Sequence, residues 1–392
     1  MTRPARPRLG VNLLWLRPGV VGGSEEYLVR QLLGLAELGE PVDVTLFGLP
    51  SLRTAHPDLA AAFDIVEAPV SGASRPLRVA AEATWLAAQV RRRRLGLVHH
   101  GGGTVPARTG GAPVVLTVHD LQVLRFPEFF SPFKRAYLRA SLPRAVRRAA
   151  VVCVPSAFVA GTVAEAYGVP AERLVVVPHG LPDAAPGWGA APAPAAAPWP
   201  GSAATPEAEL RRRYALPERF VVYPAITHPH KDHVTLLRAL ARVSDLGAVL
   251  LGGAGRAEGD VVAEISRLGL GARVVRPGRI PDADRDGCYA AALALAFPSR
   301  YEGFGAPVLE AMALGCPVLA ADATALPEVV GGAGVLLPAG DLDAWAAALR
   351  RMVDDPAERA ALAAAGRRRA AGYTAAHSAR ALVSAYRSVL PW

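Results

Sequence analysis

The chain has 392 residues, of which 52% are hydrophobic and 20% are charged, and its formal net charge is +9. This length exceeds what one hydrophobic core needs and suits two domains. No apolar run approaches the roughly 18 residues of a membrane-spanning helix, so we expect a soluble protein.

The N-terminal residues and the cysteines bear on the compartment. Basic residues precede a short apolar run, as in a signal peptide, but no small-residue cleavage site follows and Arg17-Pro18 interrupts the run. We therefore interpret residues 8–16 as a first buried strand. Cys153, Cys288 and Cys316 are odd in number and far apart, which favours reduced cytosolic thiols over a disulfide or zinc framework.

The positive charge is concentrated in arginine runs at residues 91–94, 211–213 and 367–369. These runs lack interleaved aromatic residues and any nucleic-acid-binding motif, so we expect solvated helix faces and no nucleic-acid partner. The alternative is peripheral contact with an anionic membrane, where each clustered arginine contributes about 1 kcal/mol near the surface.

Apolar runs alternate with helix-like segments along the whole chain, a pattern typical of parallel sheets covered on both faces. In the first half, the predicted strands are residues 8–16, 42–47, 95–100, 113–120, 149–156 and 173–180. In the second half, they are residues 219–226, 247–255, 272–280, 292–299, 317–322 and 334–338. This count predicts two doubly wound α/β domains.

The composition also predicts the domain boundaries. Residues 1–181 form the first domain and residues 216–373 the second. Between them, residues 182–215 form a surface-exposed linker that is rich in proline, alanine and glycine. Residues 374–392 form a final helix.

In the first domain, two positions at strand ends are candidate binding residues, because open parallel sheets bind ligands beyond the carboxyl ends of their strands. Gly22 and Gly23 follow the first strand, and Ser24 is placed to cap a helix there. The bare backbone can approach a diphosphate or an acceptor, although an ordinary capped turn is the alternative. His119 ends the strand 113–120 and can hydrogen-bond a hydroxyl, or it can be a structural histidine at a sheet edge.

In the second domain, Lys231 lies just after a strand and just before a helix, where a cation can meet phosphate groups. Of 43 basic residues only Lys134 and Lys231 are lysines, which indicates that a compact ammonium group is needed at this position. A second cation for the phosphates is left open between Arg256 and Arg279.

Two groups imitate metal sites. His228, His230 and His233 surround Lys231, whose charge would repel a metal cation. Asp282 and Asp284 follow a proline in a loop and are better explained as the N-terminal cap of a helix. We expect no metal.

The segment RYEGFGAPVLEAMALGCPV at residues 300–318 sets Glu302 and Glu310 apart by seven intervening residues. Gly303 and Gly305 permit unusual backbone angles, and the loop then enters a helix that Gly315 ends. A helix N-terminus aimed at a ligand favours anions. The alternative is an ordinary helix with a glutamate near its N-terminus.

This segment resembles the E-x7-E signature of retaining glycosyltransferases of the GT-B fold, sequence family 4. Glu302, Gly-Phe-Gly, Glu310, Ala-Met-Ala, Gly and Pro-Val occur in the family order. The residues before Asp232 resemble the Pro-His-Lys-Asn variant of the family, with aspartate in place of asparagine. The resemblance implies two Rossmann-like domains facing a cleft, an N-terminal acceptor domain, a C-terminal nucleotide-sugar donor domain, and a final helix that crosses back to the first domain.

The resemblance also implies roles for the candidate residues. Lys231 would neutralise the departing diphosphate, Glu302 would hold the transferred sugar, and His119 would lie close to the reacting carbon. The remaining candidates for donor binding are Gly22, Gly23, Gly253, Arg279, Ile280, Gly303, Phe304, Gly305 and Glu310, with Glu310 on the ribose and Ile280 on the base.

The reaction implied is retaining transfer of a hexose, with mannose favoured, to a glycan or a lipid-linked acceptor, without a metal or a separate cofactor. GDP-mannose is the first choice of donor and a UDP-sugar the second. We expect a cytoplasmic enzyme, with peripheral attachment to the inner membrane face as an option; the oligomeric state is left open. The alternatives are a sugar phosphorylase or nucleotide-sugar epimerase of the same fold, and a non-catalytic binding protein.

Overall fold

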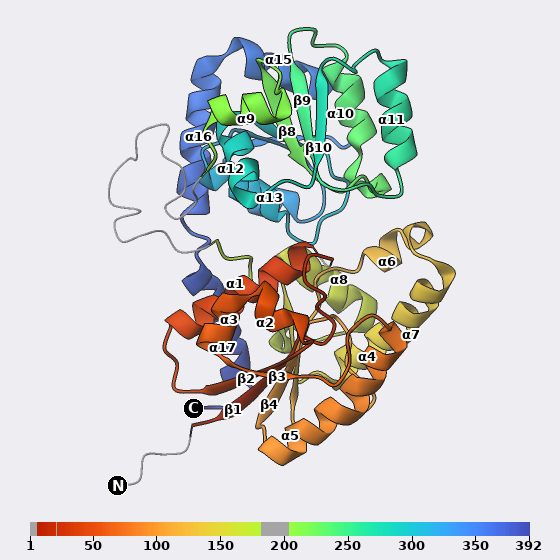
Figure 1. Ribbon diagram of the computed structural model, residues 1–392, viewed down its shortest axis with the longest axis vertical. Coiled ribbons are helices and arrows are strands. Elements are labelled where there is room, and N and C mark those ends of the chain that lie inside the picture. Colours follow the sequence, from red (N-terminus) through yellow and green to blue (C-terminus); the bar gives the residue numbers. More distant parts are fainter. Residues whose placement is uncertain (1–5, 21, 182–203) are drawn as a thin grey trace. The chain divides into compact units, whose positions relative to one another are not determined.

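The computed structural model describes residues 6–20, 22–181 and 204–392 (Figure 1). The chain divides into two compact units, and each is considered by itself. Unit 1 comprises Met1–Pro182 together with Tyr373–Trp392, and unit 2 comprises Asp183–Gly372. Most of the predicted linker, residues 182–203, lies outside the described residues.

Unit 1 is built on a seven-stranded parallel sheet with the order β3-β2-β1-β4-β5-β6-β7. Its strands are β1 Arg8–Asn12, β2 Asp43–Gly48, β3 Asp64–Glu67, β4 Leu97–His100, β5 Val114–Thr117, β6 Val151–Val154 and β7 Leu174–Val176. The sequence pattern predicts all of these strands except β3. This edge strand has only four residues, and both of its end residues are exposed, so it carries no continuous apolar signal.

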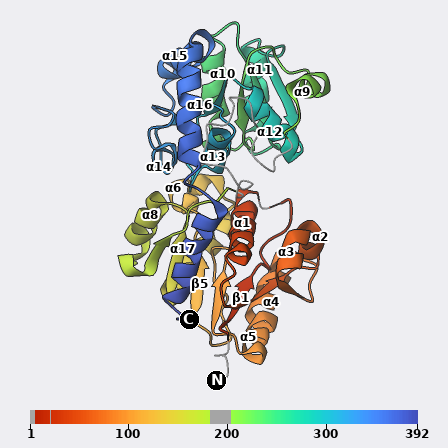
Figure 2. The ribbon, with the colours of Figure 1, turned by 90° about the vertical axis from the view of Figure 1, so that its left-hand side faces the viewer.

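Helices cover both faces of this sheet. Its helical elements are α1 Gly23–Glu37, α2 Ser51–Ala55, α3 Pro57–Ala62, α4 Arg75–Ala81, the π-helical turn η1 Glu82–Leu86, α5 Ala87–Arg93, α6 Gln122–Arg125, the 3₁₀ turn η2 Pro127–Phe129, α7 Pro132–Arg148, α8 Ala157–Tyr167, the 3₁₀ turn η3 Ala171–Arg173 and α17 Ala375–Arg387. On one face, α1 and α17 pack side by side over a core that contains Leu9, Val11 and Leu28 (Figure 2).

The other face of this sheet carries two separate apolar clusters. One lies under η1 and α5 and contains Phe47, Leu86 and Val98. The second lies under α7 and α8 and contains Val114 and Val146 among others. Because Val98 pairs with Val114 in the parallel register, both clusters occupy the same face of the sheet.

The C-terminal helix α17 completes the core of unit 1. The Thr374 side chain caps it by accepting from the His377 amide. The Tyr386 hydroxyl and His99 Nδ1 lie 2.8 Å apart in the core. Gly34 of α1 allows close packing, since a Cβ there would lie 2.7 Å from the Ala375 carbonyl oxygen. Unit 1 is therefore assembled from both ends of the chain.

Unit 2 is built on a six-stranded parallel sheet with the order β10-β9-β8-β11-β12-β13. Its strands are β8 Phe220–Pro224, β9 Gly247–Leu251, β10 Val274–Gly278, β11 Ala294–Phe297, β12 Val318–Ala321 and β13 Val335–Leu337. Its helical elements are α9 Glu207–Tyr214, the 3₁₀ turn η4 Pro229–Lys231, α10 His233–Leu240, α11 Glu258–Arg267, α12 Asp282–Ala291, α13 Ala306–Ala313, α14 Leu326–Val330, α15 Leu342–Asp354 and α16 Pro356–Ala370.

Helix α9 corrects the predicted linker, which extended to residue 215. Leu210 of α9 is fully buried, and Asp284 of α12 accepts hydrogen bonds from Thr205, Arg213 and Tyr214. These contacts fasten residues 205–214 to unit 2. The helix is short and carries a single buried apolar residue, so its apolar periodicity is too weak to separate it from a linker.

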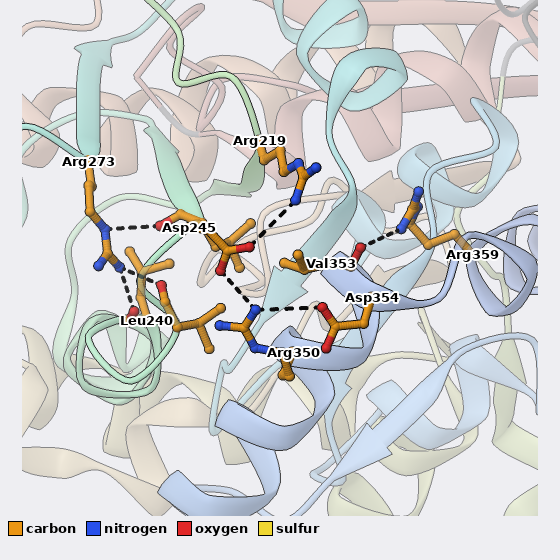
Figure 3. Close-up of polar contacts among 10 residues, drawn as sticks. Arg219, Leu240, Asp245, Arg273, Arg350, Val353, Asp354 and Arg359 are labelled. Atoms are coloured by element: carbon orange, nitrogen blue, oxygen red, sulfur yellow. Dashed lines mark hydrogen bonds and ion pairs between the residues drawn. The ribbon is translucent and has the colours of Figure 1, made fainter.

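A network of arginines and acids closes the amino edge of the unit 2 sheet (Figure 3). Asp245 lies 3.5 Å from Arg219 and 2.9 Å from Arg350 of α15. Arg273 precedes β10 and donates to three main-chain carbonyls, those of Leu240, Val243 and Leu246. The network joins α10 and α15 to the strands at the edge opposite the candidate site.

The basic runs are only partly the solvated faces that the sequence predicts. Arg213 bonds to the buried Asp284, and Arg369 donates to the carbonyls of Glu328 and Val329. By contrast, Arg91 and Arg92 of α5 are exposed. None of the helices in the described part of the chain combines the length and apolar character of a membrane-spanning segment.

Candidate functional site

Lys231 lies at the carboxyl edge of the unit 2 sheet, in the turn between β8 and α10. The turn is shaped by Asp232, which takes a left-handed conformation with φ of 50°, and by Tyr223, whose hydroxyl donates to the Lys231 carbonyl at 2.6 Å. Burial raises the pKa of Tyr223, so this phenol remains a hydrogen-bond donor. A strand end and a helix start thus fix the backbone of the lysine, as the sequence predicts.

The Lys231 ammonium forms an ion pair with Glu302. Nζ lies 2.6 Å from Oε1, and the two side chains are only 19% and 13% exposed. The same ammonium lies 5.9 Å from the centre of the Phe297 ring. The sequence analysis predicted separate roles for Lys231 and Glu302, whereas the structure brings them into direct contact.

Main-chain hydrogen bonds hold the loop that carries Glu302. Its own amide donates to the Thr324 hydroxyl at 2.9 Å, and Thr324 has a φ of 54°. The amide of Arg300 donates to the His230 carbonyl at 2.8 Å, which ties this loop to the Lys231 turn. The ends of β8, β11 and β12 therefore position one site together.

Helix α13 begins directly after this loop. Gly305 is its N-cap residue and has a φ of 104°, where a Cβ would lie 2.7 Å from Leu326 Cδ2. Glycine is thus required both by the backbone angle and by the available space. Residues 303–305 come directly before the positively polarised end of the helix, and Glu310 lies in its second turn.

Glu310 also faces a cation that the sequence analysis did not single out. Burial alone would lower the pKa of Arg285 on α12. The negative charges of Glu310 and neighbouring acids have the larger effect, so the pKa of Arg285 lies above its usual value. Arg285 also forms ion pairs with Asp282 and Asp286. Its only signal in the sequence was the helical spacing of three residues from Asp282.

The ends of β9 and β10 meet at the same edge. The amide of Gly252 donates to the Gly278 carbonyl at 2.9 Å, and Gly252 has a φ of 120°. A Cβ on Gly252 would lie 2.7 Å from the Ala225 carbonyl oxygen, whereas a Cβ on Gly253 would meet nothing within 4 Å. The sequence analysis chose Gly253 as a contact, but the fold needs glycine at Gly252.

The predicted second cations lie close to these strand ends. The Arg256 amide donates to His228 Nδ1 at 3.4 Å, next to the Lys231 turn. Arg279 and Ile280 directly follow β10, with Arg279 exposed and Ile280 half-buried. They stay predictions for phosphate and base contacts.

In unit 1, His119 lies two residues after β5, at the carboxyl edge of the sheet. Its Nε2 lies 2.8 Å from the Gly101 carbonyl, and the ring packs between Trp15 and Tyr27. Since a carbonyl can only accept, Nε2 carries the proton and Nδ1 remains an acceptor for a hydroxyl. Burial lowers the pKa of His119 and keeps the ring neutral.

The Gly22 and Gly23 loop is capped differently from the prediction. Gly22 itself is the N-cap of α1, with φ of 78° and no side-chain cap, while Ser24 lies inside the helix. The neighbouring Glu25 folds back instead, and its carboxylate accepts from the Gly19 amide at 3.0 Å and contacts His56 at 2.8 Å. The predicted serine cap is therefore wrong, because Glu25 organises this loop.

Two family models match the chain. The model described as "Glycosyl transferases group 1" matches residues 207–369, and the model described as "Glycosyltransferase Family 4" matches residues 21–184. Between them they match most of both units. The chain belongs to glycosyltransferase family 4.

Individual relatives agree with this membership. The chain is 28% identical to O-antigen chain mannosyltransferase B of Escherichia coli over 288 residues, which is 70% of each chain. It is 29% identical to D-inositol 3-phosphate glycosyltransferase of Thermobispora bispora, over 95% of this chain and 91% of the relative. This glycosyltransferase thus acts on a nucleoside-diphosphate sugar, as the sequence analysis predicts.

Solved structures support the fold. Sucrose-phosphate synthase of Thermosynechococcus elongatus matches 98% of this chain with a TM-score of 0.75 and 21% identity, over 99% of its own length. Anabaena HepE, solved with UDP and glucose, matches 98% of this chain with a TM-score of 0.72 and 23% identity, over its whole length. The predicted GT-B class, with two Rossmann-like sheets, is confirmed.

Burial keeps two of the histidines near Lys231 in their neutral form in this glycosyltransferase. Burial and the Lys231 charge lower the pKa of His230 to about 3, and burial lowers that of His233 to about 4. His233 packs against the Tyr223 ring in the core. Asp284 lies in the first turn of α12. It is a structural residue, because it is buried under its three hydrogen-bond donors. The described residues contain no cluster of three or more metal-ligating side chains.

Proposed function

We propose that this glycosyltransferase moves a hexose, with mannose favoured, from a nucleoside-diphosphate sugar to a glycan or a lipid-linked acceptor with retention at the anomeric carbon. The observation that carries the proposal is the Lys231 and Glu302 pair held beside the N-terminus of α13. A departing diphosphate needs positive groups fixed in advance, and this arrangement supplies an ammonium and a helix end.

Each residue has a proposed role. Lys231 neutralises the leaving diphosphate together with the end of α13, and Arg256 or Arg279 supplies a second positive charge. Glu302 and the amides of residues 303–305 bind the hydroxyls of the sugar, and Glu310 binds the ribose. Gly22, Gly23 and Gly253 let the backbone approach the substrates, and Ile280 contacts the base.

The proposed reaction is a displacement on one face of the sugar. The bond from the anomeric carbon to the diphosphate oxygen breaks, and that oxygen accepts the proton of the acceptor hydroxyl while the new glycosidic bond forms on the same face. His119 is neutral and can accept a hydrogen bond from a sugar hydroxyl through Nδ1. The proposal assigns no residue as a covalent nucleophile and uses no metal.

The choice of donor rests on likeness. Two relatives are named mannosyltransferases, that of Escherichia coli and the MMP alpha-(1->4)-mannosyltransferase of Mycolicibacterium hassiacum. Their names favour GDP-mannose as the donor of this chain. A UDP-sugar comes second, because Anabaena HepE was solved with UDP-glucose.

The test is calorimetric titration of a panel of nucleotide sugars. We expect one donor to bind, and Lys231→Ala to weaken it by about tenfold or more, since a charge-assisted contact to phosphate is lost. Lys134→Ala removes the other lysine of the chain, in unit 1, and should leave donor binding unchanged. Donor binding that is unchanged in both Lys231→Ala and Glu310→Ala would contradict the proposed site.

Product analysis separates the related activities. With donor and a glycan acceptor, a transferase forms an α-linked product from an α-linked donor and needs no phosphate. Products that appear only with inorganic phosphate would indicate a phosphorylase. Turnover without any acceptor would indicate an epimerase or a hydrolase.

We also propose that the enzyme works at the cytoplasmic face of an anionic membrane. Helix α7 carries six basic residues and no acidic residue, and Phe133 at its start is 75% exposed. Clustered cations attract anionic lipid, and an exposed aromatic side chain adds apolar contact. Sedimentation with vesicles tests this, and binding should need anionic lipid and weaken as salt rises.

A further inference from the structure

Unit 1 contains a cavity of about 390 Å³ on the face of the sheet that α4, η1 and α7 cover. Helix α4 meets α7 here, because the Arg75 guanidinium stands 4.7 Å above the Tyr137 ring. The residues that line the cavity are Val79, Glu82, Thr104, Val105, Pro106, Ala107, Tyr137, Ser141, Arg144, Arg147 and Arg148. All of them belong to unit 1.

The topology explains why space remains here. Neighbouring parallel strands are usually joined by a crossover helix that covers the sheet. Between β4 and β5, however, residues 101–113 form only turns and loop. The cavity therefore lies between the apolar clusters under α5 and under α7, where the crossover helix would pack. Arg148 holds the loop in place by donating to the carbonyls of Pro106 and Ala107 at 2.9 and 2.8 Å.

The rim of the cavity carries positive charge that the protein does not neutralise. Arg144 and Arg147 are exposed, and within the described ranges neither forms an ion pair with an acid. Of these two, only the Arg144 guanidinium has an acceptor among the described residues, the Ala140 carbonyl of its own helix at 3.3 Å. Two neighbouring guanidinium groups with unused donors suit a phosphate group.

The walls of the cavity are mostly apolar. Val79, Val105, Pro106 and Ala107 present aliphatic surface, which suits a hydrocarbon chain better than a sugar. Among the polar residues of the lining, Glu82 is 8% exposed, and burial raises its pKa to about 7, so that it can be neutral beside an apolar ligand.

Two further observations indicate a binding site rather than a packing defect. The Ser141 hydroxyl is buried and has no hydrogen-bond partner within the described residues. Glu82 begins a π-helical turn inside an otherwise α-helical segment, and such turns are frequent at functional sites. Buried polar groups without partners in the protein are expected where a ligand supplies them.

We propose that this cavity binds an organic phosphate with an apolar chain, its phosphate held by Arg144 and Arg147 and its chain by Val79, Val105, Pro106 and Ala107. The ligand class is a phosphate ester of a lipid-like alcohol or glyceride. The proposal goes beyond sugar transfer and does not depend on the donor assigned above.

Calorimetry of the whole protein with geranyl phosphate, a water-soluble member of this class, provides the test. Three control ligands each differ from it in one feature. Geraniol lacks the phosphate, inorganic phosphate lacks the apolar chain, and glucose 1-phosphate carries a polar sugar in place of that chain. We expect geranyl phosphate to bind at least about tenfold more tightly than each of the three, because both halves of the ligand contribute. Equal or tighter binding of inorganic phosphate or glucose 1-phosphate would overturn the proposal.

A matched pair of double variants locates the site. Arg144→Ala with Arg147→Ala should weaken geranyl phosphate by about tenfold or more. Arg135→Ala with Arg139→Ala removes the same charge from α7 but away from the cavity lining, and should change the affinity less than about threefold. Ser141→Leu, which adds bulk at the cavity, should also weaken binding. An equal loss in both double variants would overturn the proposal, because attraction would then be only to net charge.

Competition identifies the source of the natural ligand. Displacement of geranyl phosphate by vesicles that contain phosphatidic acid, but not by neutral vesicles, would assign a bilayer lipid. Displacement only by soluble phosphate esters would assign a free metabolite, and either result supports the site. Absence of saturable geranyl phosphate binding, in protein that still binds its nucleotide sugar, would overturn this inference and leave the proposed function intact.

Discussion

At the scale of single residues, the main consequence of the site is that its ammonium is already paired. Lys231 contacts Glu302 at 2.6 Å, and both side chains are largely buried. An incoming diphosphate must therefore compete with a carboxylate for the same cation. The two residues have opposite effects on a phosphate, so their substitutions should also differ in direction.

Glu302→Gln is expected to separate donor binding from transfer. Removal of the competing carboxylate should strengthen the binding of the nucleoside diphosphate product severalfold, corresponding to about 1 kcal/mol for a partly exposed pair. Transfer should fall by about a hundredfold, since the sugar loses a positioned partner. Calorimetry with the diphosphate and initial rates with the donor measure the two effects. Weaker diphosphate binding in this variant would contradict the competition.

Glu82 gives a prediction about stability and pH. Burial raises its pKa from the usual 4.5 to about 7, although a hydrogen bond from Asn12 and the charge of Arg78 oppose the shift. The protonated form is therefore favoured by folding. Its contribution to the free energy of unfolding is fully present below about pH 4.5 and is lost as the pH rises through about 7.

Glu82→Gln removes this dependence. Near pH 8 the variant should be more stable than the parent protein by up to about 3 kcal/mol, and near pH 5 by less than about 1 kcal/mol. Urea unfolding at both pH values, followed by a probe in unit 1, measures the difference. A difference that does not change with pH would show that the carboxyl titrates normally.

At the scale of elements, the strands were largely predictable and the helix caps were not. All twelve predicted strands are present, because buried parallel strands are continuous apolar runs. The edge strand β3 and helix α9 were missed, since each depends on a few contacts with distant residues rather than on its own pattern. The predicted Ser24 cap was wrong because Glu25 bonds to Gly19 and His56, and the His56 contact lies too far along the chain to be anticipated.

A pair of glycines tests how closely α17 packs on α1. Gly34→Ala places a Cβ 2.7 Å from the Ala375 carbonyl oxygen, so it should destabilise unit 1 by about 1–3 kcal/mol. Gly161→Ala is the matched control, since it lies inside α8 with nothing within 4 Å. The control should stabilise by up to about 1 kcal/mol through helix propensity alone. Thermal unfolding of both variants checks the contrast, and a similar shift in both would argue against close packing.

At the scale of the whole molecule, the sequence predicted the local placement of the candidate residues, in loops and helix starts after strands, better than it predicted how they meet. Glu302, Gly303, Phe304, Gly305 and Glu310 lie close together in the sequence, so one loop and helix fix their arrangement. The contact of Lys231 with Glu302 joins two strand ends 71 residues apart and depends on the sheet order. The cavity under α7 had no signal at all, because it results from a crossover without a helix.

The composition of unit 1 from two chain segments makes a further prediction. A chain that ends at Gly372 lacks α17, whose Leu382, Val383 and Tyr386 belong to the core of unit 1. We expect unit 1 to lose protection from hydrogen exchange, because burial of large side chains is lost. Unit 2 should still bind the nucleoside diphosphate. Retained protection of β1 and β4 in the shortened chain would contradict this expectation.

The same arrangement fixes an order of events during synthesis on the ribosome. The first 181 residues emerge before unit 2, but the segment that completes their core is translated after it. Unit 2 is therefore the first to have its whole sequence available. Until α17 is made, the surface of α1 that packs against it stays exposed. A chaperone that recognises exposed leucines would find its target there, on the side of α1 that later receives α17.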